Sequence, residues 1–448
     1  MNTVPAVKLI EANVSHEKLC ASAARISTTL GTSLEIYAKS IDENKNRALI
    51  KNVLQSGHLS FIEHATFTFA FCNVSALVEQ YFIEFRLASF TVKSRRYVNF
   101  ANQGYYASPD MNELCSDIYK DHINYLFSEY SAFVNDGIPL EDARFVLPYC
   151  FYSNFYCTVN ARELIHILRT MKYGRGKNIF ELQRLYDQII SQIEPIFPCV
   201  LAEIIPTTDD FGRNINCFFD MIPNMANETN QKCELTSYTH NAKELFDVSC
   251  HLLGKSNVNE SKAMGGRLHA LNNVCPRILE SISASFVIRN ISLSGITHFV
   301  RHRMQSIIIP PFNKVCLDTF VVPDSIKSNP KFYSRYQKVF NRNIDVIRGL
   351  RKMGLENELY LSLSGNTLDI MSTMNARELM LFFNLRCCGR AQWEIRGIAY
   401  SMLSSLREVL PDIFDDMGPS CYTKGYCPEG RLSCGQEKMQ NESNIEEY

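Results

Sequence analysis

The chain holds one dense cluster of side chains that could bind anions and move protons. Arg301, His302 and Arg303 follow one another, and His298 precedes them by one helical turn. Residues at i, i+3 and i+4 share a helix face, so we expect one polar stripe that also includes Gln305. Arginine binds phosphate with two parallel hydrogen bonds and stays charged at neutral pH. The cluster predicts a local basic site for a phosphate-bearing small molecule.

Two other interpretations of these residues stay open. Histidines four residues apart on a helix can hold zinc, so His298 and His302 could form a metal pair. An isolated Arg-His-Arg sequence can also be a solvated helix face. The rest of the sequence has to decide between them.

A second polar block occurs twice. TVNAREL begins at Thr158 and TMNAREL begins at Thr373, an offset of 215 residues. The apolar spacing predicts amphipathic helices over residues 160–171 and 375–386. Asn375 and Arg386 are eleven residues apart, close to three turns, which predicts that they share a helix face. Asn160 and Asn375 could instead be plain helix N-caps.

Two further pairs of segments show that the chain is duplicated. Leu9 matches Leu235 at an offset of 226 residues, and Arg86 matches Arg303 at an offset of 217. Blocks in the same order at nearly one offset indicate two copies of one unit rather than a solenoid of short repeats. Each unit combines strand patterns, such as residues 65–71, with amphipathic helices, which predicts an α+β fold.

The same comparison predicts the domain boundaries. We expect an N-terminal repeat over residues 1–206 and a C-terminal repeat over 233–418. An Asn-rich linker over 207–232 would join them, and a Cys-containing tail would follow over 419–448.

Composition excludes several classes of protein. The 448 residues are 46% hydrophobic and 21% charged, which argues against wholesale disorder. The formal net charge of -1 argues against a general nucleic-acid surface, and no apolar run is long enough to span a membrane. The N-terminus lacks a signal-peptide core, and 16 cysteines in this length do not suggest a secreted disulfide scaffold. We expect a cytoplasmic protein without nucleic-acid or membrane partners.

Several motifs together resemble the flavin-dependent thymidylate synthases. They are Arg301-His302-Arg303, the Glu63-His64 pair ahead of TFTF, the two NAREL blocks and AQWEIR at residues 391–396. The signature of that family is R-H-R, seven residues, Ser and shortly afterwards Arg. The resemblance covers nearly the whole chain, once in each half. It implies two tandem copies of the family fold that form a pseudo-dimer, and a homodimer of chains that would be a pseudo-tetramer.

The resemblance also implies an activity. Members of the family bind FAD, use NADPH and transfer a methylene group from methylenetetrahydrofolate to C5 of dUMP without a Cys nucleophile. Each of their nucleotide sites is shared between two chains. One chain gives R-H-R and a later Arg, and the other gives Ser, Arg and a further phosphate-binding Arg.

Neither half of this chain carries a whole site by that pattern. In the first half the R-H-R position is Glu84-Phe85-Arg86 and the late Arg position is Met171, although Ser94, Arg96 and Arg144 match the phosphate side. In the second half R-H-R and the late Arg386 are intact, but the Ser and Arg positions are Pro311 and Asn313. Our hypothesis is one composite site built from the two complementary halves.

Roles for individual residues follow from the resemblance. Ser94, Arg96 and Arg144 would hold the 5′-phosphate, and Arg386 would stabilise charge on the pyrimidine. His302 would act beside Arg386 in catalysis, and both Arg301 and His298 would also contact the nucleotide. The expected flavin contacts are Arg301, His302, Arg303, His58, Ser60, Asn160, Arg162, His166, Asn375 and Arg377.

Three alternatives concern substrate and metal. His298 stands where the family usually has a nucleotide-contacting Gln, and Val92 replaces a residue that is often acidic, so another pyrimidine nucleotide is possible. A non-catalytic homologue that binds flavin or nucleotide is the second alternative. Cys421, Cys427 and Cys434 lack paired CxxC spacing, so we expect no metal, although a three-thiolate site is the third alternative.

Overall fold

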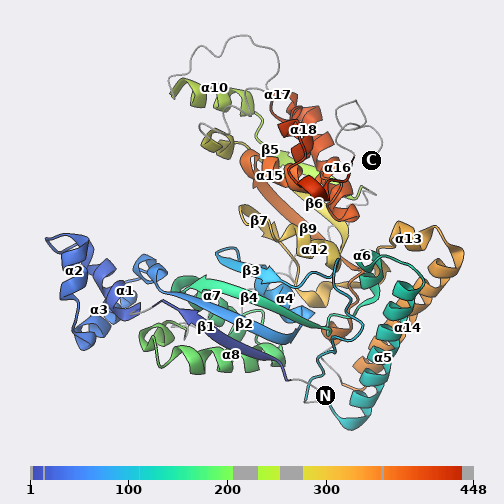
Figure 1. The fold of residues 1–448 in the computed structure, drawn as a ribbon, viewed down its shortest axis with the longest axis horizontal. Helices are drawn as coiled ribbons and strands as arrows, with labels where there is room; N and C mark the ends of the chain where they lie inside the picture. Colours follow the sequence, from blue (N-terminus) through green and yellow to red (C-terminus); the bar gives the residue numbers. More distant parts are fainter. Residues whose placement is uncertain are drawn as a thin grey trace. The chain divides into compact units, whose positions relative to one another are not determined.

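The computed structural model describes residues 4–13, 16–109, 111–204, 231–252, 276–354 and 358–435. The chain divides into two compact units. Unit 1 comprises Met1–Asn227 with Asp324–Leu363, and unit 2 comprises Glu228–Pro323 with Ser364–Tyr448. Each contains an antiparallel sheet and α-helices (Figure 1), so the predicted α+β class is confirmed. Except for Gln231 and Lys232, the predicted linker lies outside the described residues.

The sheet of unit 1 has the strand order β1-β2-β4-β3. Its strands are β1 (Ala6–Ala12), β2 (Thr66–Ser75), β3 (Ala88–Val92) and β4 (Tyr152–Asn160). Phe67, Phe69 and Phe71 alternate along β2 and are buried, because every second side chain of a strand points to the same face. The strand expected over residues 65–71 is therefore present.

Helices bury the apolar face of this sheet. The helices of unit 1 that come from the first repeat are α1 (His16–Ile26), α2 (Ser33–Lys39), α3 (Glu43–Gln55), α4 (Ala76–Ile83), α5 (Glu113–Asn135), α6 (Leu140–Ala143), α7 (Ala161–Lys172) and α8 (Phe180–Ile193). Helix α8 runs along β1 (Figure 1). Leu164 and Leu168 of α7 and Leu185 of α8 join the strand residues in one hydrophobic core.

Unit 2 repeats this arrangement. Its sheet has the order β5-β6-β9-β7, with β8 also pairing with β9. The strands are β5 (Cys233–Tyr238), β6 (Ser283–Ser292), β7 (Gln305–Ile308), β8 (Cys316–Phe320) and β9 (Asn366–Asn375). The helices are α10 (Ala242–Leu252), α12 (Leu293–Phe299), α15 (Ala376–Arg386), α16 (Trp393–Val409), α17 (Pro411–Phe414) and α18 (Ser420–Lys424). Helices α7 and α15 confirm the two amphipathic helices expected from the NAREL blocks.

The register of the strands repeats as closely as the sequence blocks do. Leu9 pairs with Phe69 in unit 1, and Leu235 pairs with Phe286 in unit 2. Each pairing is followed by an irregularity, which ends at Glu11 in the first repeat and at Ser237 in the second. Equivalent strands therefore carry equivalent irregularities, and the register gives a residue-by-residue alignment of the two repeats.

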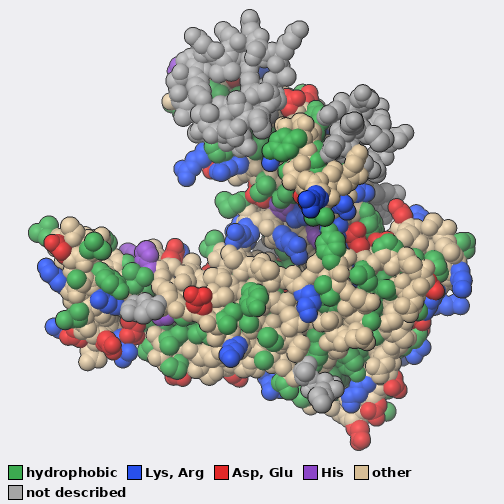
Figure 2. Space-filling view, in the orientation of Figure 1, with side chains coloured by type: hydrophobic (Ala, Val, Ile, Leu, Met, Phe, Trp, Pro, Cys, Tyr) green, Lys and Arg blue, Asp and Glu red, His purple; other side chains and the backbone are tan. Residues whose placement is uncertain are grey.

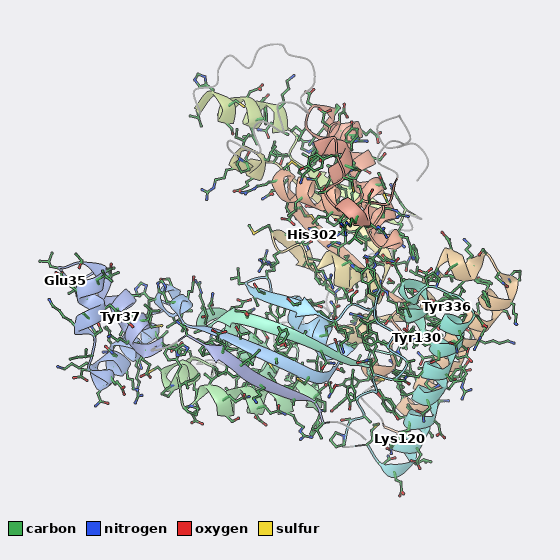
Figure 3. All side chains as sticks on the ribbon, in the orientation of Figure 1. Glu35, Tyr37, Lys120, Tyr130, His302 and Tyr336 are labelled. Carbon is green, nitrogen blue, oxygen red and sulfur yellow. The ribbon has the colours of Figure 1, made fainter. Side chains whose placement is uncertain are left out.

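A segment of the second repeat belongs to unit 1. Helices α13 (Asp324–Lys327) and α14 (Pro330–Lys352) lie there, and α14 packs beside its repeat equivalent α5 (Figure 1). Arg335 of α14 bonds Glu129 of α5 at 2.6 Å, and Tyr336 is buried along the same helix pair (Figure 3). Beyond the helices, Pro148 pairs with Leu363, which is its own equivalent at the offset of 215 residues. The two repeats therefore interlock inside one compact unit.

None of the described helices combines the length and the apolar character of a membrane-spanning helix. On the face shown in Figure 2, the basic and acidic side chains of unit 1 are interspersed.

Candidate active site

The Arg-His-Arg sequence lies in a turn between helix α12 and strand β7. Helix α12 ends at Phe299, and Gln305 is the first residue of β7, so the predicted helical stripe from His298 to Gln305 is wrong. The physical reason is a side-chain cap. Gln305 Nε2 donates to the Phe299 carbonyl at 2.8 Å and to the His302 carbonyl at 2.7 Å, which satisfies backbone acceptors after the helix has ended.

Gln305 is itself held from the other side of its amide. Ser372 Oγ of β9 donates to Gln305 Oε1 at 2.7 Å, and both side chains are buried. In the first repeat the aligned pair is Ala88 and Cys157, which cannot make this bond. The polar support of the turn is thus present in only one repeat.

His302 is the centre of a chain of three charged or polar side chains. Its Nδ1 lies 3.0 Å from Glu378 Oε1, and its Nε2 accepts a hydrogen bond of 2.8 Å from Arg386 Nε. The ring also packs edge-on against Phe382, with 4.8 Å between ring centroids. Burial lowers the pKa of His302 below its ordinary value, and Arg386 lowers it further, while Glu378 opposes the shift. The structure therefore joins two predicted catalytic residues, His302 and Arg386, directly.

The remaining residues of this cluster differ in exposure. Arg301 and Arg303 are exposed on either side of the buried His302, and His298 is buried near the end of α12. The helical spacing that a zinc pair at His298 and His302 required is absent. Among the residues that the structure describes, no group of three His, Cys, Asp or Glu side chains is arranged to hold a metal ion.

The equivalent place in the first repeat is filled by aromatic and apolar groups. Phe85 stands where His302 stands and is buried, and Met171 stands where Arg386 stands and is completely buried. Arg175 pairs with Glu84, donates to the Tyr81 carbonyl and lies over the rings of Tyr81 and Phe85. This half of the first repeat lacks the histidine and the late arginine, as the sequence predicts.

Unit 1 instead holds a cluster of three arginines at the positions predicted for phosphate binding. Arg96 forms an ion pair with Glu141, and Ser94 Oγ accepts a hydrogen bond of 3.3 Å from the Arg96 backbone N–H. Arg144 lies at the end of α6 and is only 2% exposed. Burial first, and then the nearby charge of Arg95, lowers the pKa of Arg144 to about 9, although Glu141 and Asp142 oppose the shift. The pKa of Arg144 therefore marks a place where an anion would be stabilised.

Arg95 is a member of this cluster that sequence reasoning missed. Its Nη2 bonds Glu79 Oε1 at 2.6 Å, and Ser153 Oγ also donates to the Glu79 carboxylate. All three side chains are buried. The aligned residues of the second repeat are Ile296, Phe312 and Leu368, so this network too is built in only one repeat.

The repeats themselves contain the signal that could have found these residues. At each aligned pair one copy is polar or charged and the other is apolar: Glu79 and Ile296, Arg95 and Phe312, Gln305 and Ala88, Ser372 and Cys157. Glu378 gives no such signal, because Glu163 is retained at its aligned position.

The asparagines of the NAREL blocks are helix N-caps. Asn160 Oδ1 accepts from the Glu163 N–H, and Asn375 Oδ1 accepts from the Glu378 N–H, each at 2.9 Å. Asn375 and Arg386 lie at opposite ends of α15, about 16 Å apart along its axis at 1.5 Å per residue, so only an extended ligand reaches both. Their expected meeting in one small pocket is therefore wrong.

The other expected flavin contacts lie on exposed positions. Arg162 pairs with Glu63 and Arg377 pairs with Glu280, which are equivalent ion pairs in the two repeats. His58, Ser60 and His166 are exposed, and the ring of His166 also meets Phe85 edge-on. Their contacts with flavin stay predictions.

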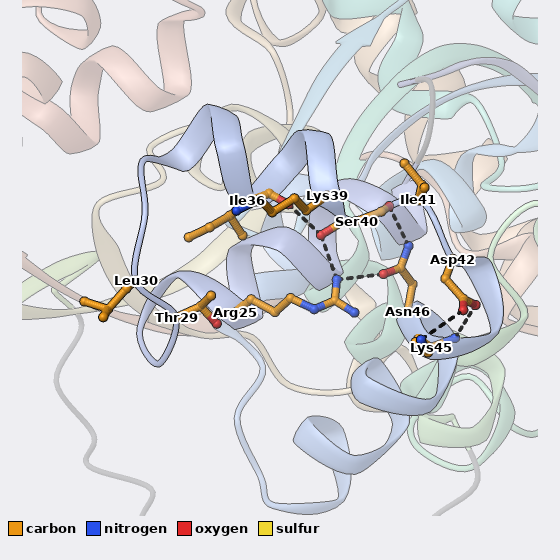
Figure 4. A pocket seen from close by; sticks show the side chains of 10 residues that line it. All are labelled: Arg25, Thr29, Leu30, Ile36, Lys39, Ser40, Ile41, Asp42, Lys45 and Asn46. Carbon is orange, nitrogen blue, oxygen red and sulfur yellow. Dashed lines mark hydrogen bonds and ion pairs between the residues drawn. The ribbon is translucent and has the colours of Figure 1, made fainter.

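A hollow of about 420 Å³ lies elsewhere in unit 1, between α1, α2 and α3 (Figure 4). Arg25 Nη1 projects toward it and bonds Ser40 Oγ and Asn46 Oδ1, each at 2.7 Å. None of the predicted site residues lines this hollow.

Comparison with known proteins decides the family. The family model for the thymidylate synthase complementing proteins matches the chain twice, over residues 8–199 and 234–412. The chain belongs to this family. The two matches confirm the predicted membership and the tandem duplication.

Curated relatives of the chain carry the name flavin-dependent thymidylate synthase. The protein from Geobacter sulfurreducens is 39% identical over 165 residues, which cover 36% of this chain and 71% of that protein. The protein from Thermococcus onnurineus is 35% identical over 167 residues, which cover 35% and 68% of the two chains. The prediction that the chain is an enzyme of this family is therefore confirmed.

A solved structure also aligns with part of the chain. It is the UMP/dUMP methylase PolB from Streptomyces cacaoi bound with 5-Br dUMP, at 22% identity and a TM-score of 0.37. The alignment covers 45% of this chain and 94% of that one.

Proposed function

We propose that this family member is an FAD-dependent enzyme that methylates C5 of dUMP at a composite site. Methylenetetrahydrofolate would give the carbon, and NADPH would give the reducing equivalents. The observation that carries the proposal is the division of two buried polar networks between the repeats. One network surrounds Arg95 and Arg144 in the first repeat, and the other surrounds His302 and Arg386 in the second.

The division is more than a loss of single residues. Buried polar groups are costly unless they are hydrogen-bonded, so a network without a function tends to be replaced by apolar residues. The first repeat has replaced the histidine network with Phe85, Met171, Ala88 and Cys157. The second repeat has replaced the arginine network with Ile296, Phe312 and Leu368. Each copy has kept the network that the other has lost, which favours one shared site over general decay.

The retained side chains suit the proposed chemistry. Arg96 and Arg144 would bind the 5′-phosphate, with the Ser94 hydroxyl donating a further hydrogen bond. Arg386 would stabilise negative charge as it develops on the pyrimidine. His302 would hold Arg386 in place through the bond to its Nε.

The residues present also fit a flavin. Arg301 and Arg303 are exposed guanidinium groups beside His302, and donors of this kind suit the diphosphate and the electron-rich ring edge of FAD. His58, Ser60, Arg162, His166 and Arg377 would add contacts. When bound, FAD would supply the redox chemistry that no side chain of the protein can supply.

The composite site is tested with substitutions in opposite repeats. We expect Arg96→Ala and Arg386→Ala each to reduce dUMP methylation by at least ~10³-fold, because each removes charge stabilisation that the other repeat cannot replace. Bound FAD, measured by absorbance, should be about one per chain. Arg184→Ala, on the exposed side of α8, is the matched control and should keep full activity.

A mixing experiment then asks which chains contribute. If both halves of a site come from one chain, co-assembly of the Arg96→Ala and Arg386→Ala chains restores no activity. Restored activity would instead show that the halves come from two chains. Two flavins per chain, or an active Arg96→Ala variant, would contradict the composite site.

A second candidate substrate is favoured by His298. Its imidazole is buried in α12 at the position where the resemblance expects a glutamine, and Val92 is half-buried where an acidic residue is expected. Another pyrimidine nucleotide is therefore the alternative to dUMP. Direct competition between dUMP and UMP for the purified enzyme, read as the ratio of kcat/KM, distinguishes them.

The setting of the enzyme completes the proposal. We infer a cytoplasmic protein whose partners are small molecules, namely a nucleotide, a folate and NADPH. A homodimer with four copies of the fold would match the expected pseudo-tetramer. Sedimentation of the purified chain tests this assembly.

A further inference from the structure

Glu378 has no role in the chemistry described so far, yet it is buried against the central histidine. Its carboxylate lies 3.0 Å from His302 Nδ1, and His302 Nε2 lies 2.8 Å from Arg386 Nε. We propose that Glu378 is a positioning residue, which holds His302 in the tautomer protonated at Nδ1 so that Nε2 can orient Arg386. This inference rests on the proposed function for the role of Arg386, but the state of His302 can be measured without any turnover.

The hydrogen-bond partners determine the tautomer. The Nε of a guanidinium always carries a proton, so the ring nitrogen that faces it has to accept. A neutral imidazole has one N–H, which leaves Nδ1 as the donor and the Glu378 carboxylate as its acceptor. The lowered pKa of His302 agrees with a neutral ring. The opposite tautomer would place two N–H groups against each other at 2.8 Å.

The surroundings keep this chain of contacts in one geometry. Glu378 sits in the first turn of α15, where the helix dipole and the Asn375 cap favour a negative charge. Phe382, one turn later, packs against the imidazole, and Gln305 holds the His302 carbonyl. Arg386 ends the same helix. One short helix thus supplies the acceptor, the packing surface and the oriented cation.

The first repeat offers a natural control within the same molecule. Glu163 occupies the position of Glu378 and is similarly buried, at 8% exposure against 6%. Its neighbours at the other two positions are Phe85 and Met171, which have no polar group to orient. A carboxylate needed only for the local fold would matter equally in both repeats, whereas a positioning carboxylate matters only in the second.

The experiment compares three variants of the full chain with bound FAD. Glu378→Gln keeps an oxygen that can accept from His302 Nδ1, Glu378→Leu removes it, and Glu163→Leu makes the same change in the control repeat. The tautomer of His302 is read from the imidazole ¹⁵N shifts, and its signal is assigned by its loss in His302→Phe. Activity is read as kcat and KM for the nucleotide, and folding as the melting temperature and flavin content.

We expect Glu378→Leu to lose the single Nδ1–H tautomer and to reduce kcat by about 10–100-fold, the range seen when an orienting partner of a functional histidine is removed. Glu378→Gln should keep the tautomer and most of kcat, and Glu163→Leu should leave both unchanged. An unaltered ¹⁵N signal in Glu378→Leu would overturn the proposal, as would an equal loss of kcat in Glu163→Leu. If the wild-type enzyme methylates no pyrimidine nucleotide, the proposed function is wrong, while the ¹⁵N result still decides the role of Glu378.

Discussion

At the scale of single residues, the site is held together by charges that the fold alone does not need. Arg144 is completely surrounded by protein, and Arg95 adds a second positive charge nearby. Because the pKa of Arg144 falls to about 9 from an ordinary value of 12.5, its charge opposes folding at every pH below about 9. A bound anion would remove this cost. Binding and stability are thus opposed at this residue.

Arg144→Met tests that opposition. Without ligand, we expect the variant to be at least as stable as the wild-type protein, because a buried charge is replaced by an apolar chain of similar length. Inorganic phosphate or dUMP should raise the melting temperature of the wild-type protein but not that of Arg144→Met. Thermal denaturation at pH 7 with and without each anion measures both effects, with Arg184→Ala as the control. A phosphate-dependent rise in Arg144→Met equal to that of the wild type would exclude Arg144 from the anion site.

Sequence reasoning identifies the residues of a known signature and misses their supports. Ser94, Arg96, Arg144, His302 and Arg386 follow from the signature because they lie at fixed spacings. Arg95, Glu79 and Glu378 do not, because their roles depend on contacts across 16 and 76 residues that only the folded chain creates. The polar-to-apolar exchanges between the repeats are the one local signal of such supports.

At the scale of the elements, the regular parts of the fold could be predicted and the turns could not. Strand β2 and helices α7 and α15 follow from apolar periodicity, because burial against the core dictates it. Helix α12 ends before the Arg-His-Arg residues because a distant strand residue, Gln305, caps it and Ser372 holds Gln305. Nothing in the spacing of residues 298–305 shows this.

The bond between Gln305 and Ser372 predicts a coupling between their substitutions. Gln305→Ala and Ser372→Cys each install the residue of the first repeat, and each single change leaves a buried polar partner unsatisfied, at a cost of about 1–3 kcal/mol. The double variant leaves neither, so we expect the two losses in unfolding free energy to be less than additive by about 1 kcal/mol. Because the Arg-His-Arg turn loosens in all three variants, FAD affinity should fall in each. Denaturant titration and flavin fluorescence measure the two quantities, and additive losses would show that the bond does not hold the turn.

At the scale of the whole molecule, duplication has made the repeats interdependent. Unit 1 takes α13 and α14 from the second repeat, and the Tyr149 and Cys150 N–H groups donate to the carbonyls of Ser362 and Tyr360. His122 also bonds Asn343 at 2.8 Å, and the Tyr360 hydroxyl donates to Glu181. These are buried partners that the first repeat cannot replace by itself. The chain therefore differs from two independent domains on a string.

Cutting the chain between its repeats tests this interdependence. We expect residues 1–206 alone to aggregate or to lack a cooperative melting transition, because α5 would expose Tyr130 and Phe133 and the backbone near Pro148 would lose its partners. Residues 1–206 joined by a flexible linker to residues 324–363, which restores every contact of unit 1, should fold cooperatively. Calorimetry and size-exclusion chromatography compare the two proteins at equal concentration. If residues 1–206 alone melt cooperatively as a monomer at the temperature of the joined protein, the segment from the second repeat is dispensable, and each repeat is an autonomous domain. If only the joined protein folds, the first repeat depends on the second for its own structure, and the duplication has become irreversible at the level of the fold as well as of the site.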